Sequence, residues 1–277
     1  MVKSTPPTEQ TGKHSNLHKM SVEALISAMH EIDSEALEAV GRVKKEIEKF
    51  VVHLVERMEK GGRLFYMGAG TSGRLGVVDA SECPPTFGVE EGTVVGLIAG
   101  GDSAIRKAVE GAEDDFLQGW KDLTKHNVTK VDTVVGIAAS GRTPYVIGAI
   151  KEARKMGMLT ACITCNPKSD LALESEYPIE AISGPEFVTG STRLKAGTAT
   201  KLILNMITTV TMIQLGHVKG SQMVDMQLSN KKLIERGSKM VAEATGLSNN
   251  DAKELLLEKG SVRSAVNSFS INKDHSS

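Results

Sequence analysis

Two short segments of the chain combine glycine with hydroxyl side chains. The segment Gly68–Gly76 reads Gly-Ala-Gly-Thr-Ser-Gly-Arg-Leu-Gly, and Ala138–Pro144 reads Ala-Ala-Ser-Gly-Arg-Thr-Pro. Each follows an apolar run and precedes a helix-compatible segment, so each should present backbone N–H groups and hydroxyls at a helix N-terminus. Turns of this kind suit a phosphate group. We therefore expect the two turns to converge on one phosphate ester or on the phosphate and hydroxyls of a phosphosugar.

Two other interpretations compete for these turns. Gly68, Gly70 and Gly73 satisfy the G-x-G-x-x-G pattern of dinucleotide-binding proteins, and Glu90 and Glu91 fall near the expected place of the ribose-binding acid. Both segments also fit tight strand-to-helix turns without a ligand. The hydroxyl pair in the first turn and the second, similar turn favour phosphosugar binding. The predicted substrate-binding residues are Gly70, Thr71, Ser72, Gly73, Arg74, Ser140, Gly141, Arg142 and Thr143.

Cysteine and histidine give no comparable signal. Cys162 and Cys165 have the spacing of a redox or metal pair, but they lie in an apolar run with no second pair nearby, which favours a buried strand end. Of the seven histidines, His14 and His18 alone are spaced i, i+4, in an irregular segment. We predict no metal site.

The elements that must position the turns follow from the hydrophobic pattern. Five short apolar runs, each ending in small residues and followed by helix-compatible sequence, are typical of parallel strands with crossover helices. The runs are Arg63–Met67, Thr93–Ala99, Thr133–Ala138, Leu159–Thr164 and Ile179–Ser183. The pattern predicts an α/β fold with an open, doubly wound parallel sheet, whose ligand site lies beyond the carboxyl ends of the strands.

Helical segments flank this sheet in the sequence. Apolar spacing predicts a helix that starts at Ser34 as N-cap and ends near Gly61, and a long helix at Arg193–Leu215. The C-terminal part is expected to be helical, with a stop at Gly246 and an N-cap at Ser248. Residues 1–19 show no periodicity and predict an arm that is mobile or ordered by docking.

Composition limits the function classes. The 277 residues carry 33 Lys plus Arg against 34 Asp plus Glu, a formal net charge of −1. This balance offers no global attraction to nucleic acid or to an anionic membrane, and no membrane segment is expected. Three cysteines, an odd number, argue against a disulfide scaffold and favour a reducing compartment, the cytoplasm.

Longer strings in the chain resemble one family. They are Gly68–Phe87, Gly96–Gly101, Ala108–Asp114, the turn through Ser140, Gly184–Glu186 and Thr189–Thr198. They are similar, in order, to the N-acetylmuramic acid 6-phosphate etherase family of the phosphosugar-binding sugar isomerase superfamily, which is related to glucokinase regulatory protein. The likeness spans roughly Thr8 to Leu247, and such strings are far more specific than a glycine pattern.

The resemblance implies a fold, a reaction and a site. It implies a five-stranded parallel sheet flanked by helices, a homodimer, and no metal or organic cofactor. The implied reaction removes D-lactate from N-acetylmuramic acid 6-phosphate by elimination and hydration, leaving N-acetylglucosamine 6-phosphate. By the motif match, Glu82 and Glu113 are the catalytic acid/base groups. Without that match each would be interpreted as a solvated surface carboxylate, because Glu110, Asp114 and Asp115 compete for the same role.

Alternatives remain within the superfamily, and one departure concerns the arm. A non-catalytic phosphosugar sensor or an aldose-ketose phosphosugar isomerase would use the same turns. Thr8-Glu9-Gln10 is followed by Thr11-Gly12, where the family usually continues with Arg-Asn. We predict three parts: an N-terminal arm and helices at 1–49, the sugar isomerase domain at 50–216 and a C-terminal helical region at 217–277.

Overall fold

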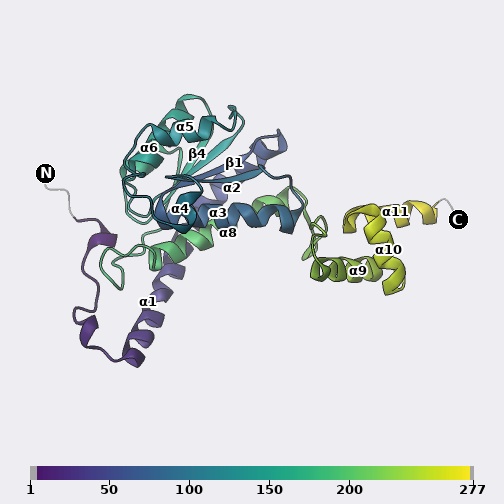
Figure 1. Ribbon diagram of the computed structural model, residues 1–277, viewed down its shortest axis with the longest axis horizontal. Helices are drawn as coiled ribbons and strands as arrows, with labels where there is room; N and C mark the ends of the chain where they lie inside the picture. The colour runs from purple at the N-terminus through teal and green to yellow at the C-terminus, as the bar shows by residue number, and fades with distance from the viewer. Residues whose placement is uncertain (1–4, 275–277) are drawn as a thin grey trace. The chain divides into compact units, whose positions relative to one another are not determined.

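The computed structural model describes residues 5–274, with side chains described up to Ser270 (Figure 1). Its centre is a sheet of five strands in which every pairing is parallel. The strands are β1 (Leu64–Gly68), β2 (Val94–Ile98), β3 (Thr133–Ile137), β4 (Leu159–Thr164) and β5 (Tyr177–Glu180). The first four lie within a residue of their predicted bounds, and β5 starts two residues earlier than expected. The predicted doubly wound parallel sheet is confirmed.

The strand order β2-β1-β3-β4-β5 contains one reversal, between β1 and β3. The chain leaves β1 for β2 on one side and then returns to place β3 on the other side. In register, Gly68 at the end of β1 pairs with Ile137 at the end of β3. The turns that follow these strands therefore start at the same level beyond the sheet, at its topological switch point.

Helices cover both faces of the sheet. On one face α5 (Gln118–Thr124), α6 (Pro144–Lys155) and α7 (Asp170–Glu174) bury a core that includes Phe65, Met67 and Val134. The opposite face carries α2 (Lys44–Glu59) and α3 (Gly70–Phe87). The short helix α4 (Ser103–Arg106) follows β2.

Glycines let α3 lie directly on the strands. A Cβ at Gly96 in β2 would come within 2.6 Å of Val77 Cα, and a Cβ at Gly76 would come within 2.9 Å of Tyr66 Cβ. At the start of the helix, a Cβ at Gly73 would meet the Ile98 side chain at 2.6 Å. Side chains at these places would push α3 off the sheet and move the first turn.

Two of the helix predictions have different outcomes. The predicted helix at Arg193–Leu215 is confirmed as α8 (Lys195–Gln214). The predicted start at Ser34 is wrong, because α1 (Val22–Arg42) begins with Ser21 as N-cap, whose hydroxyl accepts a hydrogen bond from Ala24 N–H. Ser34 lies inside the helix and donates to the Glu31 carbonyl.

An ion pair between a buried lysine and a half-buried glutamate joins α1 to the start of α8. The Lys195 ammonium, 1% exposed, donates to Glu35 at 2.5 Å, and Lys13 of the N-terminal arm donates to the same carboxylate at 2.7 Å. Nearby, the fully buried Glu186 carboxylate accepts hydrogen bonds from the backbone N–H groups of Lys195 and Ala196, the first residues of α8. Burial raises the pKa of Glu186 above its ordinary value, although those bonds oppose the rise.

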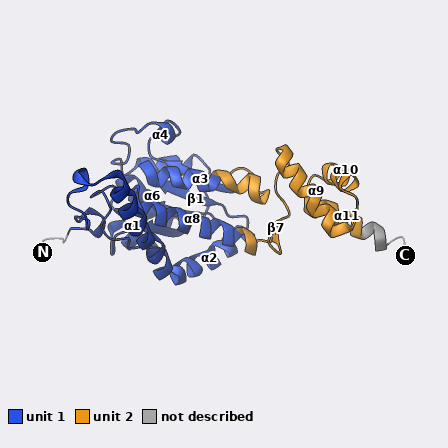
Figure 2. Cartoon of the chain, turned by 90° about the horizontal axis from the view of Figure 1, so that it is seen from below, with its two compact units in different colours: residues 1–80, 93–211 blue, residues 81–92, 212–277 orange. Residues whose placement is uncertain are grey.

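The chain divides into two compact units (Figure 2). The first contains the sheet and extends to Ala80, with Thr93–Thr211; it includes the 3₁₀ turns η1 (Pro7–Glu9) and η2 (Leu17–Lys19). The second contains Ser81–Gly92 and the residues from Met212 onward. The division predicted from the sequence, at residues 49 and 216, stays a prediction. No helix of the described chain is long and apolar enough to cross a membrane.

The second unit has a core of its own, which includes Met226, Met240 and Leu256. Its elements are the end of α3, a hairpin of β6 (Val218–Lys219) and β7 (Gln222–Met223), and the helices α9 (Lys231–Thr245), α10 (Asn249–Lys259) and α11 (Val262–Asp274). The predicted stop and N-cap are confirmed: Gly246 is left-handed with φ 79°, and the Ser248 hydroxyl accepts from Asp251 N–H.

The ion pairs of Glu35 predict that two substitutions lower the free energy of unfolding by different amounts. Glu35→Ala should lower the free energy of unfolding by about 3 kcal/mol or more, because it leaves the Lys195 ammonium buried without its partner. Lys13→Ala removes a cation that is 72% exposed and should cost far less, because water screens an exposed ion pair. Urea unfolding of both variants measures the difference, and equal losses would contradict it.

The same ion pairs predict a pH dependence. Burial opposes ionisation of Glu35, but hydrogen bonds from Lys13 and Lys195 hold its pKa below the ordinary value of 4.5. A lowered pKa means that the stabilisation is fully present above that ordinary value and is lost as pH falls through the folded-state pKa. The wild type should therefore lose more stability than Glu35→Ala between neutral and strongly acidic pH, measured by the same unfolding experiment.

Candidate functional site

The first turn joins β1 to α3. Gly70 has φ 51°, a left-handed conformation with no atom close to where a Cβ would lie, and it is the first residue of the helix. Thr71 and Ser72 follow in the first helical turn, and both are partly exposed. Gly73 is buried against Ile98. Free N–H groups and two hydroxyls thus lie together at the N-terminus of an 18-residue helix, which suits an anion.

Arg74 in the same turn is engaged within the fold. Its guanidinium donates to the carbonyl oxygens of Ala104 and Ile105 in α4, each at 2.8 Å. These bonds hold the segment after β2 against the start of α3. The predicted substrate contact of Arg74 stays a prediction beside this structural role.

The second turn joins β3 to α6. Gly141 has φ 66°, and a Cβ there would lie 2.2 Å from Ser169. The Ser140 hydroxyl accepts a hydrogen bond from Arg142 N–H at 3.2 Å, while the Arg142 side chain is exposed. Thr143 is the N-cap of α6 but makes no side-chain capping bond, so its hydroxyl has no role in capping.

Glu113 lies in the turns between α4 and α5, at the first glycine turn. Its backbone carbonyl accepts a hydrogen bond from Tyr145 N–H at 3.0 Å, which ties it to the first turn of α6. Its side chain is exposed and lines a cavity of about 180 Å³ together with Gly70, Arg74 and Glu110. The structure therefore places Glu113 at the same cavity as Gly70 and Arg74, two of the predicted substrate-binding residues.

Glu82 lies on α3 within the second unit and is exposed. Cys83 and Phe87 beside it are buried, and the two prolines between them are partly buried. The backbone here is held by a hydrogen bond from Gln227 N–H to the Pro85 carbonyl, at 3.3 Å. The Glu82 side chain is exposed although its apolar neighbours Cys83 and Phe87 are buried.

Several residues near the turns were missed or left open by the sequence. Asn166 follows β4 and hydrogen-bonds to Thr8 of the arm and to Ala139 beside Ser140. A polar residue directly after a strand is a signal that could have identified Asn166. Lys195 lies in the string Thr189–Thr198 that resembles the family, and the pairing of its buried ammonium with Glu35 gives it a structural role.

The cysteine prediction is confirmed. Cys162 lies in β4 and Cys165 directly after it, and both are fully buried and free. Burial raises the pKa of each thiol to about 12, so neither is a thiolate at neutral pH. Among the described residues, no group of three or more His, Cys, Asp or Glu side chains is placed to hold a metal ion.

The strand order 2-1-3-4-5 is shared with flavodoxin-like folds, and the two glycine turns with hydroxyls at its switch point fit the sugar isomerase class. Family models agree: residues 46–154 match the glucokinase regulatory protein N-terminal SIS domain, and residues 118–210 match the SIS domain. Solved structures share the fold. A phosphoheptose isomerase from Francisella tularensis has a TM-score of 0.56 at 18% identity, covering 70% of this chain and 100% of its own.

Relatives in sequence extend over nearly the whole chain. The N-acetylmuramic acid 6-phosphate etherase of Christiangramia forsetii is 57% identical over 266 residues, which cover 96% of this chain and 97% of the relative. That of Bacteroides fragilis is 55% identical over 262 residues, covering 95% and 93%. This chain belongs to the N-acetylmuramic acid 6-phosphate etherase family.

The geometry of the second turn predicts a strong effect of Gly141→Ala. A left-handed alanine costs about 1–2 kcal/mol by itself, and the clash with Ser169 should add about 1–3 kcal/mol. Gly61→Ala is a matched control, because Gly61 has φ 81° and no atom lies within 4 Å of the place that its Cβ would take. Chemical unfolding compares the two variants, and an equal loss of stability would contradict a clash at Gly141.

Proposed function

We propose that this chain cleaves the D-lactyl ether of N-acetylmuramic acid 6-phosphate, giving N-acetylglucosamine 6-phosphate and D-lactate, in the recycling of cell-wall amino sugars. The observation that carries the proposal is identity of 55–57% to etherases over 95% or more of the chain. The two turns at the switch point supply what the phosphate of such a substrate needs, hydroxyls and free N–H groups at helix N-termini.

The reaction needs two proton transfers around one carbon–carbon bond. In the open-chain sugar, a base takes the proton from carbon 2 while an acid protonates the lactyl oxygen leaving carbon 3, and a double bond forms between these carbons. Water then adds, with its hydroxyl on carbon 3 and a proton on carbon 2. The net change is hydrolysis of the ether, so no electrons are transferred to a cofactor.

We assign the proton transfers to Glu82 and Glu113 on the strength of the motif match. Glu82 protonates the departing lactyl oxygen and, once deprotonated, helps water to add; Glu113 is the other acid/base group. The position of Glu113 beside Gly70 supports its assignment, because a general base must lie close to a substrate whose phosphate the turns hold. The Ser140–Thr143 turn and the Gly70–Arg74 turn would bind that phosphate.

The phosphosugar sensor and the aldose-ketose isomerase are not favoured, because the relatives that match nearly the whole chain are named etherases. Incubating the purified wild type with N-acetylmuramic acid 6-phosphate and, separately, with an aldose phosphate, without added metal or cofactor, discriminates among the three. Release of D-lactate supports the etherase. Saturable binding without lactate would point to a sensor, and conversion of an aldose phosphate to its ketose to an isomerase.

The wider setting of the protein is part of the proposal. The phosphosugar-binding domain of residues 50–216 would carry the chemistry, with 1–49 and 217–277 as flanking parts. Three free cysteines support a cytoplasmic location, where thiols stay reduced.

A homodimer is supported by exposed apolar side chains on two neighbouring helices, Val78 on α3 and Met206 and Val210 on α8. A hydrogen bond from Asn205 to Asp79, at 2.7 Å, joins these two helices.

Removal of the acid should abolish turnover and spare binding. Glu82→Gln should reduce D-lactate release about 100- to 10,000-fold, because the leaving oxygen loses its proton donor. The dissociation constant of N-acetylglucosamine 6-phosphate, measured by calorimetry, should stay within about threefold, a shift below about 1 kcal/mol. Glu90→Gln, at an exposed position of the same unit, serves as control. Wild-type turnover in Glu82→Gln would refute the assignment.

Two neighbouring glutamates allow a sharper test of the second group. Glu110 and Glu113 line the same cavity, yet the motif match selects Glu113. Glu113→Gln should lower kcat at least about 100-fold, whereas Glu110→Gln should leave kcat nearly unchanged. Initial rates of lactate release give both values. The reverse order would move the catalytic role to Glu110.

The apolar face predicts how the dimer can be broken. Val210→Lys should convert a dimer to a monomer in size-exclusion chromatography with light scattering, because a charge would be buried in the interface. Val52→Lys, at an apolar position of α2 that is 53% exposed against 42% for Val210, should leave the dimer intact. A monomeric wild type, or a dimeric Val210→Lys, would reject this face as the interface.

A further inference from the structure

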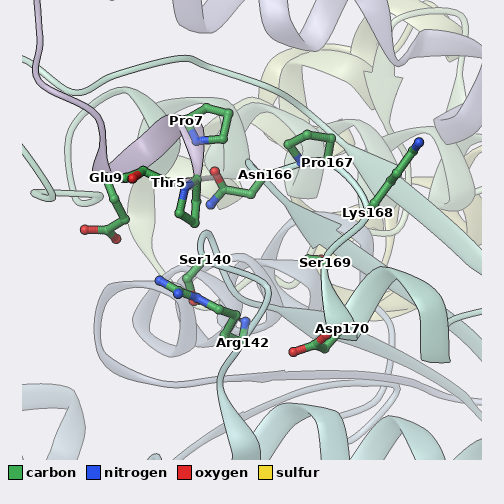
Figure 3. A pocket seen from close by; sticks show the side chains of 11 residues that line it. Thr5, Pro7, Glu9, Ser140, Arg142, Asn166, Pro167, Lys168, Ser169 and Asp170 are labelled. Atoms are coloured by element: carbon green, nitrogen blue, oxygen red, sulfur yellow. Dashed lines mark hydrogen bonds between the residues drawn. The ribbon is translucent and has the colours of Figure 1, made fainter. Parts of the chain in front are cut away.

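A polar pocket of about 590 Å³ lies beside the second turn (Figure 3). Ser140 and Arg142 form part of its lining. The remaining walls come from two segments far apart in the sequence: Thr5–Glu9 of the N-terminal arm and Asn166–Asp170 after β4. The arm is thus a wall of a cavity that opens onto a predicted phosphate-binding turn.

The arm is held there by a pair of buried residues. Thr8 N–H donates to Asn166 Oδ1 at 3.1 Å, and Asn166 Nδ2 donates to the Thr8 hydroxyl at 2.8 Å. Thr8 is fully buried and Asn166 is 3% exposed. We call this pair the Thr8–Asn166 latch. Because both side chains are removed from water, loss of either partner would leave a polar group unsatisfied.

The latch also reaches the phosphate-binding turn. Asn166 Nδ2 donates a second hydrogen bond, to the Ala139 carbonyl at 3.1 Å, and Cys165 N–H donates to the same oxygen at 3.0 Å. Two residues on, the Gly141 carbonyl accepts from Leu171 N–H at 3.0 Å. The backbone on either side of Ser140 is therefore shaped by the segment that carries Asn166. The Asn166 side chain thus contacts both Thr8 and the backbone carbonyl just before Ser140.

The arm brings a charged group to the pocket as well. Glu9 directly follows Thr8 and lines the cavity, as does the exposed Arg142. Figure 3 shows their side chains on the same side of the pocket. A carboxylate and a guanidinium at one cavity suit a ligand that carries both hydroxyl donors and an anionic group, as a sugar phosphate does.

We propose that Thr8 and Asn166 are positioning residues for phosphosugar binding: the latch sets the shape of the Ser140 turn and fixes the arm as a wall of the sugar pocket. This inference rests on the proposed function for the identity of the ligand. The latch acts on binding, since neither residue is assigned a proton transfer. It also accounts for an ordered arm in a segment of sequence that shows no periodicity.

Thr8→Val in the full chain tests the latch, because it removes the hydroxyl and keeps the side-chain shape and the backbone N–H. Thr11→Val is the matched control, an exposed threonine of the same arm. The KM and kcat of lactate release are measured together with the dissociation constant of N-acetylglucosamine 6-phosphate by calorimetry. Circular dichroism melting checks that each variant is folded.

Thr8→Val should raise KM and the dissociation constant about three- to tenfold, the loss of one buried hydrogen bond, with kcat within about twofold of wild type. Thr11→Val should match wild type. Asn166→Leu, which removes the two donated bonds and the accepted one without adding a charge, should show a larger rise in the same two constants. Unchanged constants in Thr8→Val, an effect confined to kcat, or an equal effect of Thr11→Val would overturn the proposal.

The binding measurement separates this proposal from the proposed function. If the wild type binds the sugar phosphate but releases no lactate, the proposed function fails while the dissociation constants still decide the role of the latch. A wild type that does not bind the sugar phosphate overturns the latch proposal as well.

Discussion

The pairing of β1 with β3 is the constraint on which the site depends. Because β3 lies beside β1 and not beside β2, the sheet reverses its order there, and the turns after Gly68 and Ile137 begin side by side. Both strands are buried along their whole length, so a slip in register would disrupt the packing of the helices on them, such as that of Gly76 against Tyr66 and Ile137. Two helix N-termini that suit an anion thereby come together, although the net charge of the chain is only −1.

Close backbone contact then decides which residues those turns can contain. Gly73, Gly76 and Gly96 let α3 approach the strands, and Gly141 accommodates Ser169. The glycine pattern of the first turn that resembles a dinucleotide fingerprint thus has a packing explanation. In this chain the G-x-G-x-x-G string is explained by the close contact of helix and sheet, and the prediction of a phosphosugar depends on the neighbouring hydroxyls.

Polar groups removed from water organise the periphery of the first unit. Lys195 is held by Glu35, Glu186 caps the first N–H groups of α8, and Thr8 is satisfied by Asn166. Each arrangement joins segments distant in sequence, and each leaves an uncompensated buried group if one partner is lost. The arm and the start of α8 therefore have one defined place around the sheet, which a purely apolar contact would specify less sharply.

The sequence by itself determined the strands, the two glycine turns, the ends of the C-terminal helices and the family. Those features are local: apolar runs, caps such as Ser248, and strings of residues read in order. Tertiary structure decided what depends on partners far along the chain. Ser34 was a plausible N-cap, yet buried side chains such as Ile32 and Ala36 continue the helix through it. Thr8 and Asn166 lie 158 positions apart, and no local pattern marks a hydrogen bond between them. A helix cap or a strand depends on residues adjacent in the sequence, whereas a buried contact such as Thr8–Asn166 depends on how distant segments fold together.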